Sequence, residues 1–391
     1  MRVTPLPLPA GPDVLGALDR LVAAVEGTGP PLAPCPAGGA PPTLPALRAA
    51  QVPPELALVV STSGSAGTPK RVLLTRDNLL ASADGAHERL LGPGAWLLAV
   101  PPHHIAGIQV LLRASLGTGE PTVMDLSGGF TAAGFVAAAE RMPSTGYPSY
   151  VSLVPTQVSR LLLDPAGRDT LAAFDAVLCG GATTPPGLVA QAREHDIRLV
   201  LTFGTTETSG GCVYDGMPLP LSHVHIDNDR HVTLGGATVG HGYLTRTGVS
   251  EDGFYTDADG VRWFRTEDLG SLDDTGRLVV HARADDLINS GGIKIAPGPV
   301  EDALVRYLPG VRDAVVVGVP DDEWGEVVAA AVTLVPRATR APSAQDARAA
   351  LRGVVPDVAL PKLLAVVDAL PLRGPGKPDR VAIAGWFVAR A

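Results

Sequence analysis

Short apolar runs that favour strands alternate with runs of helical periodicity from residue 56 to about residue 202. After a strand, a helix usually carries the chain back so that the next strand pairs in parallel with the first. This alternation therefore predicts an α/β fold with layered, mostly parallel sheets. The strand-like runs are 56–60, 72–75, 96–100, 122–124, 150–154, 176–179 and 198–201, and the helical runs are 105–116, 132–141, 156–163 and 186–195.

The segments on either side of this region have other patterns. The first part of the chain predicts a helix over 13–25 and a Pro-rich connection over 30–54. Residues 222–281 carry short runs between turn signals, which predicts a small antiparallel β region. Beyond residue 282 the pattern predicts a second compact α+β domain of about a hundred residues. Its expected elements are helices over 298–307 and 344–353 and strands over 314–319, 327–335 and 363–367.

The segment 61–70, Ser-Thr-Ser-Gly-Ser-Ala-Gly-Thr-Pro-Lys, joins two of the predicted strands. Its two glycines leave backbone amides unobstructed, and its five hydroxyl side chains add hydrogen-bond donors. Such a loop suits a polyphosphate, with Lys70 at its end. The alternative is a flexible surface hairpin, which small polar residues also form.

The composition narrows the classes of function. Lysine occurs at only four positions among 31 basic residues, which suggests that a compact ammonium is needed at 70, 294, 362 and 377. The formal charge of −9 disfavours a nucleic-acid or anionic-membrane partner. We expect a cytoplasmic protein without a membrane span, because no apolar run is long enough and the N-terminus lacks a signal-peptide core. The three scattered cysteines predict free thiols.

Further polar loops follow predicted strands, which is where α/β sheets bind ligands. Three small residues follow the strand at 176–179, and the loop 202–211 sets Thr206 beside Glu207. Asp268 is expected after another strand, Arg283 in a fourth loop, and Lys377 in a loop rich in Pro and Gly. Walker-type, G-x-G-x-x-G and G-x-S-x-G motifs do not occur, which disfavours P-loop NTPases, Rossmann dehydrogenases and α/β-hydrolases.

Five of these segments resemble, in order, the motifs of the adenylate-forming superfamily of acyl- and aryl-CoA ligases, luciferases and peptide-synthetase adenylation domains. Segment 61–70 is similar to its T-S-G-[ST]-T-G-x-P-K phosphate loop, and 203–207 to its Y-G-x-T-E. Segments 265–270, 282–294 and 372–377 are similar to its R-T-G-D-L-G, G-R-x-D-D-x-I-K-x-x-G-x-K and P-R-T-x-x-G-K. At 391 residues the chain is shorter than most members, and we expect it to lack much of the usual N-terminal subdomain.

The resemblance implies two reactions at one site. A carboxylic acid and ATP form an acyl-adenylate and pyrophosphate, and coenzyme A then takes the acyl group. Thr206 is expected to donate to the α-phosphate and Glu207 to hold Mg²⁺, which accepts one or two carboxylates besides phosphate oxygens. The residues expected to hold the β- and γ-phosphates are Thr62, Ser63, Gly64, Ser65, Ala66, Gly67, Thr68 and Lys70.

The nucleoside end of ATP is assigned in the same way. Asp268 is expected to accept from both ribose hydroxyls, with Arg283 beside it. The adenine is expected to lie against Gly180, Gly181, Ala182, Phe203, Gly204 and Thr205. Taken singly, Glu207 could be a helix cap or a surface charge, Asp268 a turn residue and Arg283 an interdomain salt bridge. As an ordered set they favour the ATP site.

The resemblance also implies a mobile C-terminal domain. Its hinge is Asp285, which divides the chain into an adenylation domain, 1–284, and a small domain, 285–391. Lys377 is expected to bridge the α-phosphate and the carboxylate during adenylation. In a second arrangement of the domains, Gly291, Gly292 and Lys294 would face coenzyme A. The alternatives are a solvated loop lysine and an ordinary linker.

Two residues depart from the family motifs. Glu267 and Ala282 stand where the motifs have glycine, so the loop at the ribose could turn differently.

The acyl pocket is expected near His104 and the loop Ser209, Gly210, Gly211. If Ile105 opens a helix, Gln109 and Arg113 lie on its face at i+4 spacing, and an arginine there suits an acid with a second carboxylate. The alternatives are a packing histidine and a solvated helix face.

Within the superfamily the chain most resembles the o-succinylbenzoate:CoA ligases of bacterial menaquinone synthesis. Another aryl- or acyl-CoA ligase, an adenylation enzyme that loads a carrier protein, and a catalytically silent nucleotide-binding protein remain open. A homodimer is possible, but the sequence predicts no oligomeric state.

Overall fold

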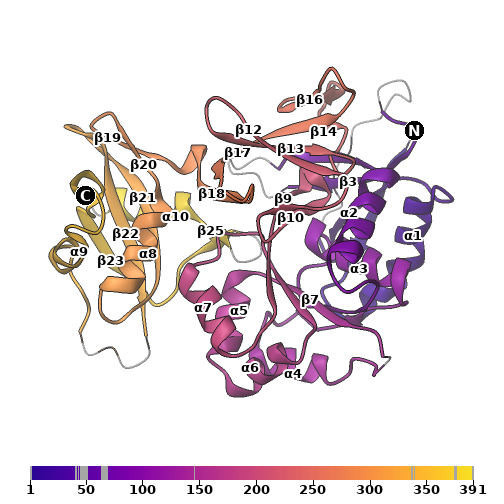
Figure 1. Cartoon of the computed structure of the whole chain (residues 1–391), viewed down its shortest axis with the longest axis horizontal. Helices are drawn as coiled ribbons and strands as arrows, with labels where there is room; N and C mark the ends of the chain where they lie inside the picture. The colour runs from indigo at the N-terminus through magenta and orange to yellow at the C-terminus, as the bar shows by residue number, and fades with distance from the viewer. Residues whose placement is uncertain are drawn as a thin grey trace. The chain divides into compact units, whose positions relative to one another are not determined.

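The computed structural model describes residues 2–39, 42, 44, 52–62, 69–144, 146–335, 338, 340–373 and 377–389. The chain forms two compact units (Figure 1). The first unit contains residues 1–266 and 272–278, and the second contains 267–271 and 279–391. The second unit thus includes residues before 285, where the sequence placed the domain boundary. The hinge at Asp285 stays a prediction. The mixed α/β class is confirmed.

The first unit is built around a seven-stranded sheet with the order β11-β10-β9-β8-β7-β5-β6. Strands β6, β5, β7, β8 and β9 are parallel, as expected, and β10 runs antiparallel to β9. Their bounds are Ala95–Leu98 for β5, Thr122–Val123 for β6, Ser149–Leu153 for β7, Ala176–Cys179 for β8, Leu199–Thr205 for β9, Gly210–Tyr214 for β10 and Met217–Pro218 for β11.

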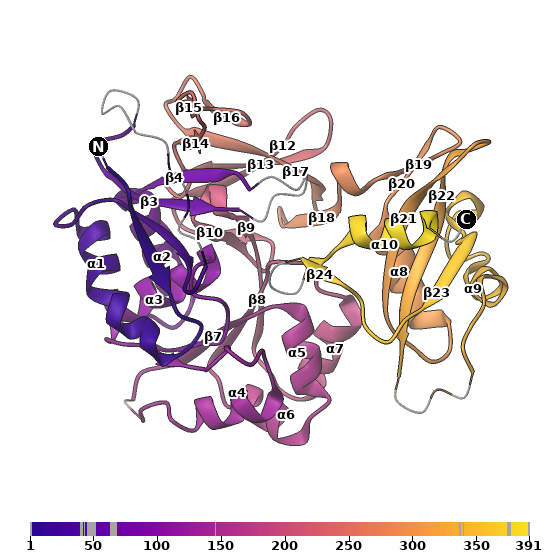
Figure 2. The same cartoon turned by 180° about the vertical axis from the view of Figure 1, so that it is seen from behind.

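Helices cover both faces of this sheet, as Figures 1 and 2 show. Buried residues of α1, α2 and α3 join one core with the sheet, and those of α4 to α7 join another on its opposite face. Their bounds are Leu18–Glu26 for α1, Arg76–Arg89 for α2, Ile105–Gly117 for α3, Ala132–Ala139 for α4, Pro155–Leu162 for α5, Pro165–Ala172 for α6 and Pro186–Glu194 for α7.

Two further sheets complete the first unit. One has the order β1-β2-β3-β4-β14-β15 and packs against α1 and α2. The other contains the path β12-β13-β17-β16, which is antiparallel where the pairing is described, as expected for 222–281. Their bounds are Thr4–Leu8 for β1, Leu32–Pro36 for β2, Leu56–Ser61 for β3, Arg71–Thr75 for β4, Ser222–Ile226 for β12, His231–Gly236 for β13, Gly242–Leu244 for β14, Val249–Ser250 for β15, Phe254–Thr256 for β16 and Arg262–Leu272 for β17.

The second unit is a sheet with a helix layer on each face. The sheet has the order β20-β19-β22-β21, with β23 beside β22. One face packs on α8 and α9 and the other on α10. The bounds are Leu278–Arg283 for β18, Ile288–Ser290 for β19, Ile293–Ile295 for β20, Val311–Asp321 for β21, Gly325–Leu334 for β22, Leu363–Val366 for β23, Leu372–Arg373 for β24, Lys377–Pro378 for β25, Pro297–Tyr307 for α8, Ala344–Leu351 for α9 and Arg380–Val388 for α10.

Strands β21 and β22 show why this sheet could be predicted. The run Val315, Val316 and Val317 is buried on both faces, which gives the continuous β-branched stretch of a covered strand. The short hairpins β19–β20 and β24–β25 were not predicted, because two- and three-residue strands leave no period to detect.

The Pro-rich connection expected over 30–54 was wrong in its first part. Leu32–Pro36 is strand β2, which pairs in parallel with β1, Thr4–Leu8. Prolines alternate along both strands, so the residues between them supply the donors that the ladder needs.

Of the first two helices, one was predicted in part and the other was not predicted. The segment expected as one helix begins as a 3-10 turn, Pro12–Ala17, before α1. Helix α2 was missed, because its buried positions are mostly small residues such as Ser82, Ala83, Gly85 and Ala86, which give no apolar stripe. Thr75 and Asn78 cap its start reciprocally.

Two expected loops are partly strands. β9 continues to Thr205, so residues 202–205 are paired with β10 rather than free. β17 includes Asp268, which was expected in a loop after a strand.

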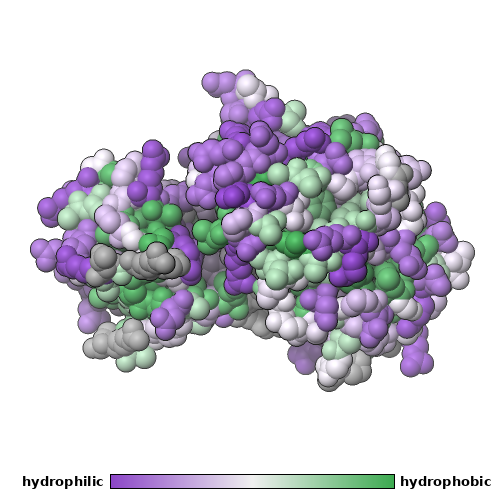
Figure 3. All heavy atoms as spheres, turned by 90° about the horizontal axis from the view of Figure 1, so that it is seen from below, coloured by the Kyte–Doolittle hydropathy of each residue, from purple (hydrophilic) through white to green (hydrophobic). Residues whose placement is uncertain are grey.

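Hydrophilic and hydrophobic residues are interspersed on the face that Figure 3 shows. Within the described ranges, no helix is both long enough and apolar enough to cross a membrane.

Candidate active site

The hairpin predicted around 61–70 is confirmed in the part that the structure describes. β3 and β4 pair antiparallel, and Thr62 and Lys70 close the hairpin by a backbone hydrogen bond of 2.8 Å. The amide of Lys70 also donates to the hydroxyl of Thr62 at 3.2 Å. The expected phosphate ligands Ser63, Gly64, Ser65, Ala66, Gly67 and Thr68 lie outside the described residues.

Lys70 reaches toward two side chains of the first unit. Its Nζ lies 3.4 Å from Asp252 and 4.6 Å from the centroid of the Tyr243 ring. Both Lys70 and Asp252 are at least half exposed, so this ion pair contributes little to stability. The ammonium is therefore held at the base of the hairpin but remains open to an anionic ligand.

Glu207 lies in a 3-10 turn, Thr206–Thr208, directly after β9. It is 8% exposed, which excludes the surface-charge alternative. The hydroxyl of Tyr243 donates to its Oε1 at 2.8 Å, and its backbone carbonyl accepts from the amide of Gly240. The segment 240–243 thus holds Glu207 at both its backbone and its carboxylate.

This donor set fits a magnesium ion. Glu207 offers one carboxylate whose Oε1 is anchored, and Mg²⁺ commonly takes one or two carboxylates and completes its shell with phosphate oxygens and water. Thr206, at the start of the same turn, is half-buried beside it, as its assignment to the α-phosphate requires.

The residues expected around adenine come from neighbouring strand ends. β8 and β9 are parallel neighbours, and Gly180 directly follows β8. A Cβ on Gly180 would lie 2.2 Å from Oγ1 of Thr202, so the two strand ends approach too closely for a side chain. Gly204, with a φ of +158°, has the same constraint against the carbonyl of Gly210.

The other adenine candidates differ in their surroundings. Gly181 has a left-handed φ of +82° and turns the chain just after β8. Phe203 packs partly against the core between β10 and β13. Thr205 Oγ1 is buried without a hydrogen-bond partner among the described residues, so it can serve a ligand.

The acyl candidates gather at the start of α3. Ile105 opens this helix, and His104 precedes it as the N-cap residue, as the sequence predicts. The rings of His103 and His104 lie 4.3 Å apart, and burial lowers the pKa of His103. A Cβ on Gly210 would lie 3.5 Å from Cγ of Gln109, so α3 and the start of β10 are in contact.

Ser209, also assigned to the acyl pocket, has a packing role. Its backbone is left-handed, with a φ of +55°, and its hydroxyl donates to the carbonyl of Thr238 at 3.0 Å. Ser82 in turn donates to the carbonyl of Ser209. These bonds fix the turn that presents Gly210 and Gly211.

Arg113 is 4% exposed, which excludes the solvated-helix alternative. Its guanidinium lies 5.5 Å from the centroid of the Trp96 ring, and it is close enough to Tyr214 to lower the pKa of that phenol against the larger, raising effect of burial. A Cβ on Gly211 would lie 3.3 Å from the Tyr214 ring, so this tyrosine lies close to both Arg113 and the glycines at the start of β10. A direct contact between Arg113 and the acid stays an untested prediction.

The ribose candidates lie together in the second unit. Arg283 is 3.8 Å from Asp268 and makes two bonds, of 2.9 and 2.8 Å, to Asp285. Burial lowers the pKa of Arg283, but Asp285 and Asp268 more than offset this and raise it. Asp268 is 8% exposed, so it is no ordinary turn residue. Glu267 and Ala282, the two departures from the family motifs, leave this Asp–Arg pair intact.

The expected hinge residue is followed by a second ionic group. Asp286 lies 3.2 Å from Arg380, which also bonds Glu301 at 2.6 Å. Burial raises the pKa of Asp286. Because Arg380 begins the helix after Lys377, this group ties the residue after the expected hinge to the segment that follows Lys377, within one unit.

Lys377 is exposed, on the short hairpin β24–β25 rather than in a loop. The coenzyme A candidates lie on another hairpin, β19–β20, where Gly291 and Gly292 form the turn with φ of +58° and +79°. Lys294 is exposed on β20. These positions are compatible with their assigned roles.

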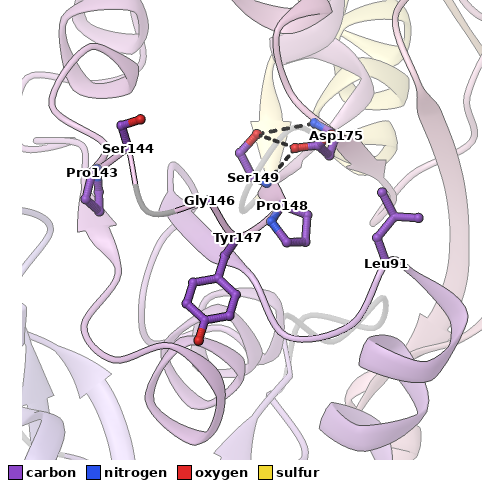
Figure 4. Close-up of a pocket in the computed structure, with 8 residues that line it drawn as sticks. All are labelled: Leu91, Pro143, Ser144, Gly146, Tyr147, Pro148, Ser149 and Asp175. Carbon is purple, nitrogen blue, oxygen red and sulfur yellow. Dashed lines mark hydrogen bonds between the residues drawn. The ribbon is translucent and has the colours of Figure 1, made fainter.

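A surface hollow of the first unit lies elsewhere (Figure 4). Ser149 and Asp175 bond to each other there, and Asp175 pairs with Arg198 at 3.0 Å. The hollow has none of the predicted site residues in its lining, which is Leu91, Pro143, Ser144, Gly146, Tyr147, Pro148, Ser149 and Asp175.

Comparison with known proteins agrees with this geometry. Residues 18–239 match the model of a family described as AMP-binding enzyme, and residues 299–377 match its C-terminal domain. The chain belongs to this family. Glu207 lies in the first matched range and Lys377 in the second.

The chain is also similar to individual members. It is 41% identical, over 99% of its length and 97% of the relative, to a Mycobacterium tuberculosis protein named "Probable 2-succinylbenzoate--CoA ligase". Bacillus subtilis o-succinylbenzoate CoA synthetase, solved with its acyl-adenylate intermediate, matches with a TM-score of 0.70 and 28% identity over 84% of this chain and 69% of that one. The amide bond synthetase McbA of Marinactinospora thermotolerans matches with a TM-score of 0.74 and 27% identity over 98% and 80%.

Tyr243 and Tyr214 were not predicted as site residues. Neither lies in a loop after a parallel strand, and only the neighbours that the fold gives them, Glu207 and Arg113, indicate a role.

Proposed function

We propose that this chain is an ATP-dependent, AMP-forming acid:CoA ligase whose acid is 2-succinylbenzoate. The observation that carries the proposal is the similarity to a named ligase of this acid along essentially the whole length of both chains. The reaction would serve menaquinone synthesis, and we expect it in the cytoplasm.

Separate groups of described residues are suited to separate parts of the ATP molecule. Lys70 and the hairpin would hold the leaving pyrophosphate, and Thr206 would donate to the α-phosphate, where charge develops as the acid attacks. Asp268 and Arg283 would bind the ribose. When bound at Glu207, Mg²⁺ would neutralise phosphate charge and fix the phosphate chain.

The second unit would supply the remaining groups. Lys377 would bridge the α-phosphate and the carboxylate in the first reaction. Gly291, Gly292 and Lys294 would meet coenzyme A in the second, after rotation about Asp285.

Release of pyrophosphate measured with a panel of carboxylic acids tests this proposal. We expect release with 2-succinylbenzoate, and a CoA thioester only when coenzyme A is added. Release with another acid but not with 2-succinylbenzoate would be consistent with the ligase class but would overturn the substrate assignment. No release with any acid would overturn the enzyme.

A second candidate is amide-bond formation, which the similarity to McbA favours. Replacing coenzyme A by an amine in the same assay distinguishes them. Amide product in preference to thioester would support this candidate.

A further inference from the structure

One tyrosine of the first unit contacts both charged residues assigned to the phosphates and the metal. The hydroxyl of Tyr243 donates to Oε1 of Glu207 at 2.8 Å, and its ring lies beneath Nζ of Lys70 at 4.6 Å from the centroid. Both contacts use different parts of the same side chain. The bond to Glu207 is buried, whereas Lys70 lies at the exposed edge.

The ring of Tyr243 is held in place by the fold. It is 5% exposed, and the Phe254 ring packs against it nearly edge-on, with centroids 5.2 Å apart. Strand β14 pairs with β4 so that Tyr243 is opposite Val72, two residues after Lys70. The pairing of these strands therefore brings Tyr243 beside the end of the phosphate hairpin.

We propose that Tyr243 is a positioning residue that orients the carboxylate of Glu207 for the metal and seats the ammonium of Lys70. The inference rests on the proposed ATP-dependent function. A hydrogen bond to an ionised carboxylate is stronger and more directional than a neutral one, so the anchored Oε1 fixes where the second oxygen points. Groups that orient a metal ligand in this way change metal affinity when they are removed.

The ring adds a second effect. A cation over an aromatic face is attracted to it, which keeps Lys70 near the hairpin before ATP arrives. The same tyrosine therefore links capture of the phosphates to binding of the metal. A purely packing tyrosine would fill the same space without either effect.

Tyr243→Phe removes the hydroxyl and keeps the ring. Mn²⁺, which can replace Mg²⁺ and is visible by electron paramagnetic resonance, is titrated into the enzyme with an ATP analogue that has a methylene bridge between its α- and β-phosphates. We expect Mn²⁺ affinity to fall about 10- to 100-fold. Tyr255→Phe is the matched control, because Tyr255 is an exposed tyrosine that stacks on Trp263, and it should bind Mn²⁺ as the wild type does.

Affinity of the analogue without metal tests the second half of the proposal. Tyr243→Phe should leave this affinity unchanged, whereas Tyr243→Leu, which also removes the ring, should weaken it several-fold. Unchanged Mn²⁺ affinity in Tyr243→Phe overturns the orientation of Glu207. Equal analogue affinities in Phe and Leu variants overturn the seating of Lys70.

Melting temperatures of all variants accompany these titrations. A Tyr243→Phe chain that does not fold would mark the hydroxyl as structural and would also overturn the proposal. Neither titration contains an acid or coenzyme A. A wrong acid assignment, which the pyrophosphate panel detects, therefore leaves both results unchanged.

Discussion

Gly180→Ala tests the close approach of two strand ends at the expected adenine site. The added Cβ would lie 2.2 Å from Oγ1 and 2.8 Å from the carbonyl oxygen of Thr202. The hydroxyl is bonded to the carbonyl of Cys179, and the second atom belongs to the backbone of β9, so neither moves freely. Overpacking of this kind costs about 1–3 kcal/mol, because β8 and β9 must separate.

The matched control is Gly187→Ala in α7, where a Cβ would meet no atom within 4 Å. Gly187→Ala should leave the free energy of unfolding unchanged or raise it by about 0.4–1 kcal/mol, because alanine lowers the conformational entropy of the unfolded chain. Calorimetric melting of both variants gives the comparison, with about 2–4 °C expected per kcal/mol for a domain of this size.

Binding of ATP to the same two variants tests the adenine assignment. Separation of the strand ends should weaken ATP binding in Gly180→Ala and leave it intact in Gly187→Ala, as isothermal titration would show. If Gly180→Ala melts and binds ATP like its control, both the close approach and the assignment are refuted. A loss of stability without a loss of ATP affinity would refute the assignment alone.

Three other outcomes are expected. Lys377→Ala should abolish pyrophosphate release but still form thioester from supplied acyl-adenylate; equal loss of both would contradict its role. All three cysteines are buried, and burial raises the pKa of Cys179 to about 11 and of Cys212 to about 12, so a disulfide reagent should react with no thiol until the protein unfolds. Burial lowers the pKa of His87 and His103, so the unfolded chain binds more protons below about pH 6.5 and the free energy of unfolding should fall from pH 7 to pH 5. His103→Asn should make that decline shallower in denaturant titrations, and an unchanged slope would count against the buried, neutral state of His103.

The sequence predicted those parts of the fold that depend on local pattern. The hairpin around 61–70, the parallel β5, β7, β8 and β9, and the valine-rich strands of the second unit follow from period and composition. The residues assigned to ATP come from motifs that are each short and continuous in the sequence. Thr206 and Glu207 could be assigned together because one such motif contains both.

Helices and strands whose buried residues show no apolar periodicity were not predicted. Helix α2 buries small residues, and β1 and β2 alternate with prolines, so neither gives the usual signal. Arg113 was placed on one helix face with Ile105 and Gln109, but its burial beside Trp96 and Tyr214 depends on how α3 packs against β5 and β10.

The sequence by itself thus determined the class of fold and the family motifs, and from those motifs the residues expected to carry charge to ATP. Only the tertiary structure decided how those charges are held: Tyr243 on Glu207 and Lys70, and Asp268 beside Arg283. The physical reason is that helix and strand periods act over a few residues. A hydrogen bond between residues 207 and 243 depends instead on how β14 pairs with β4, and that is settled only when the sheets pack.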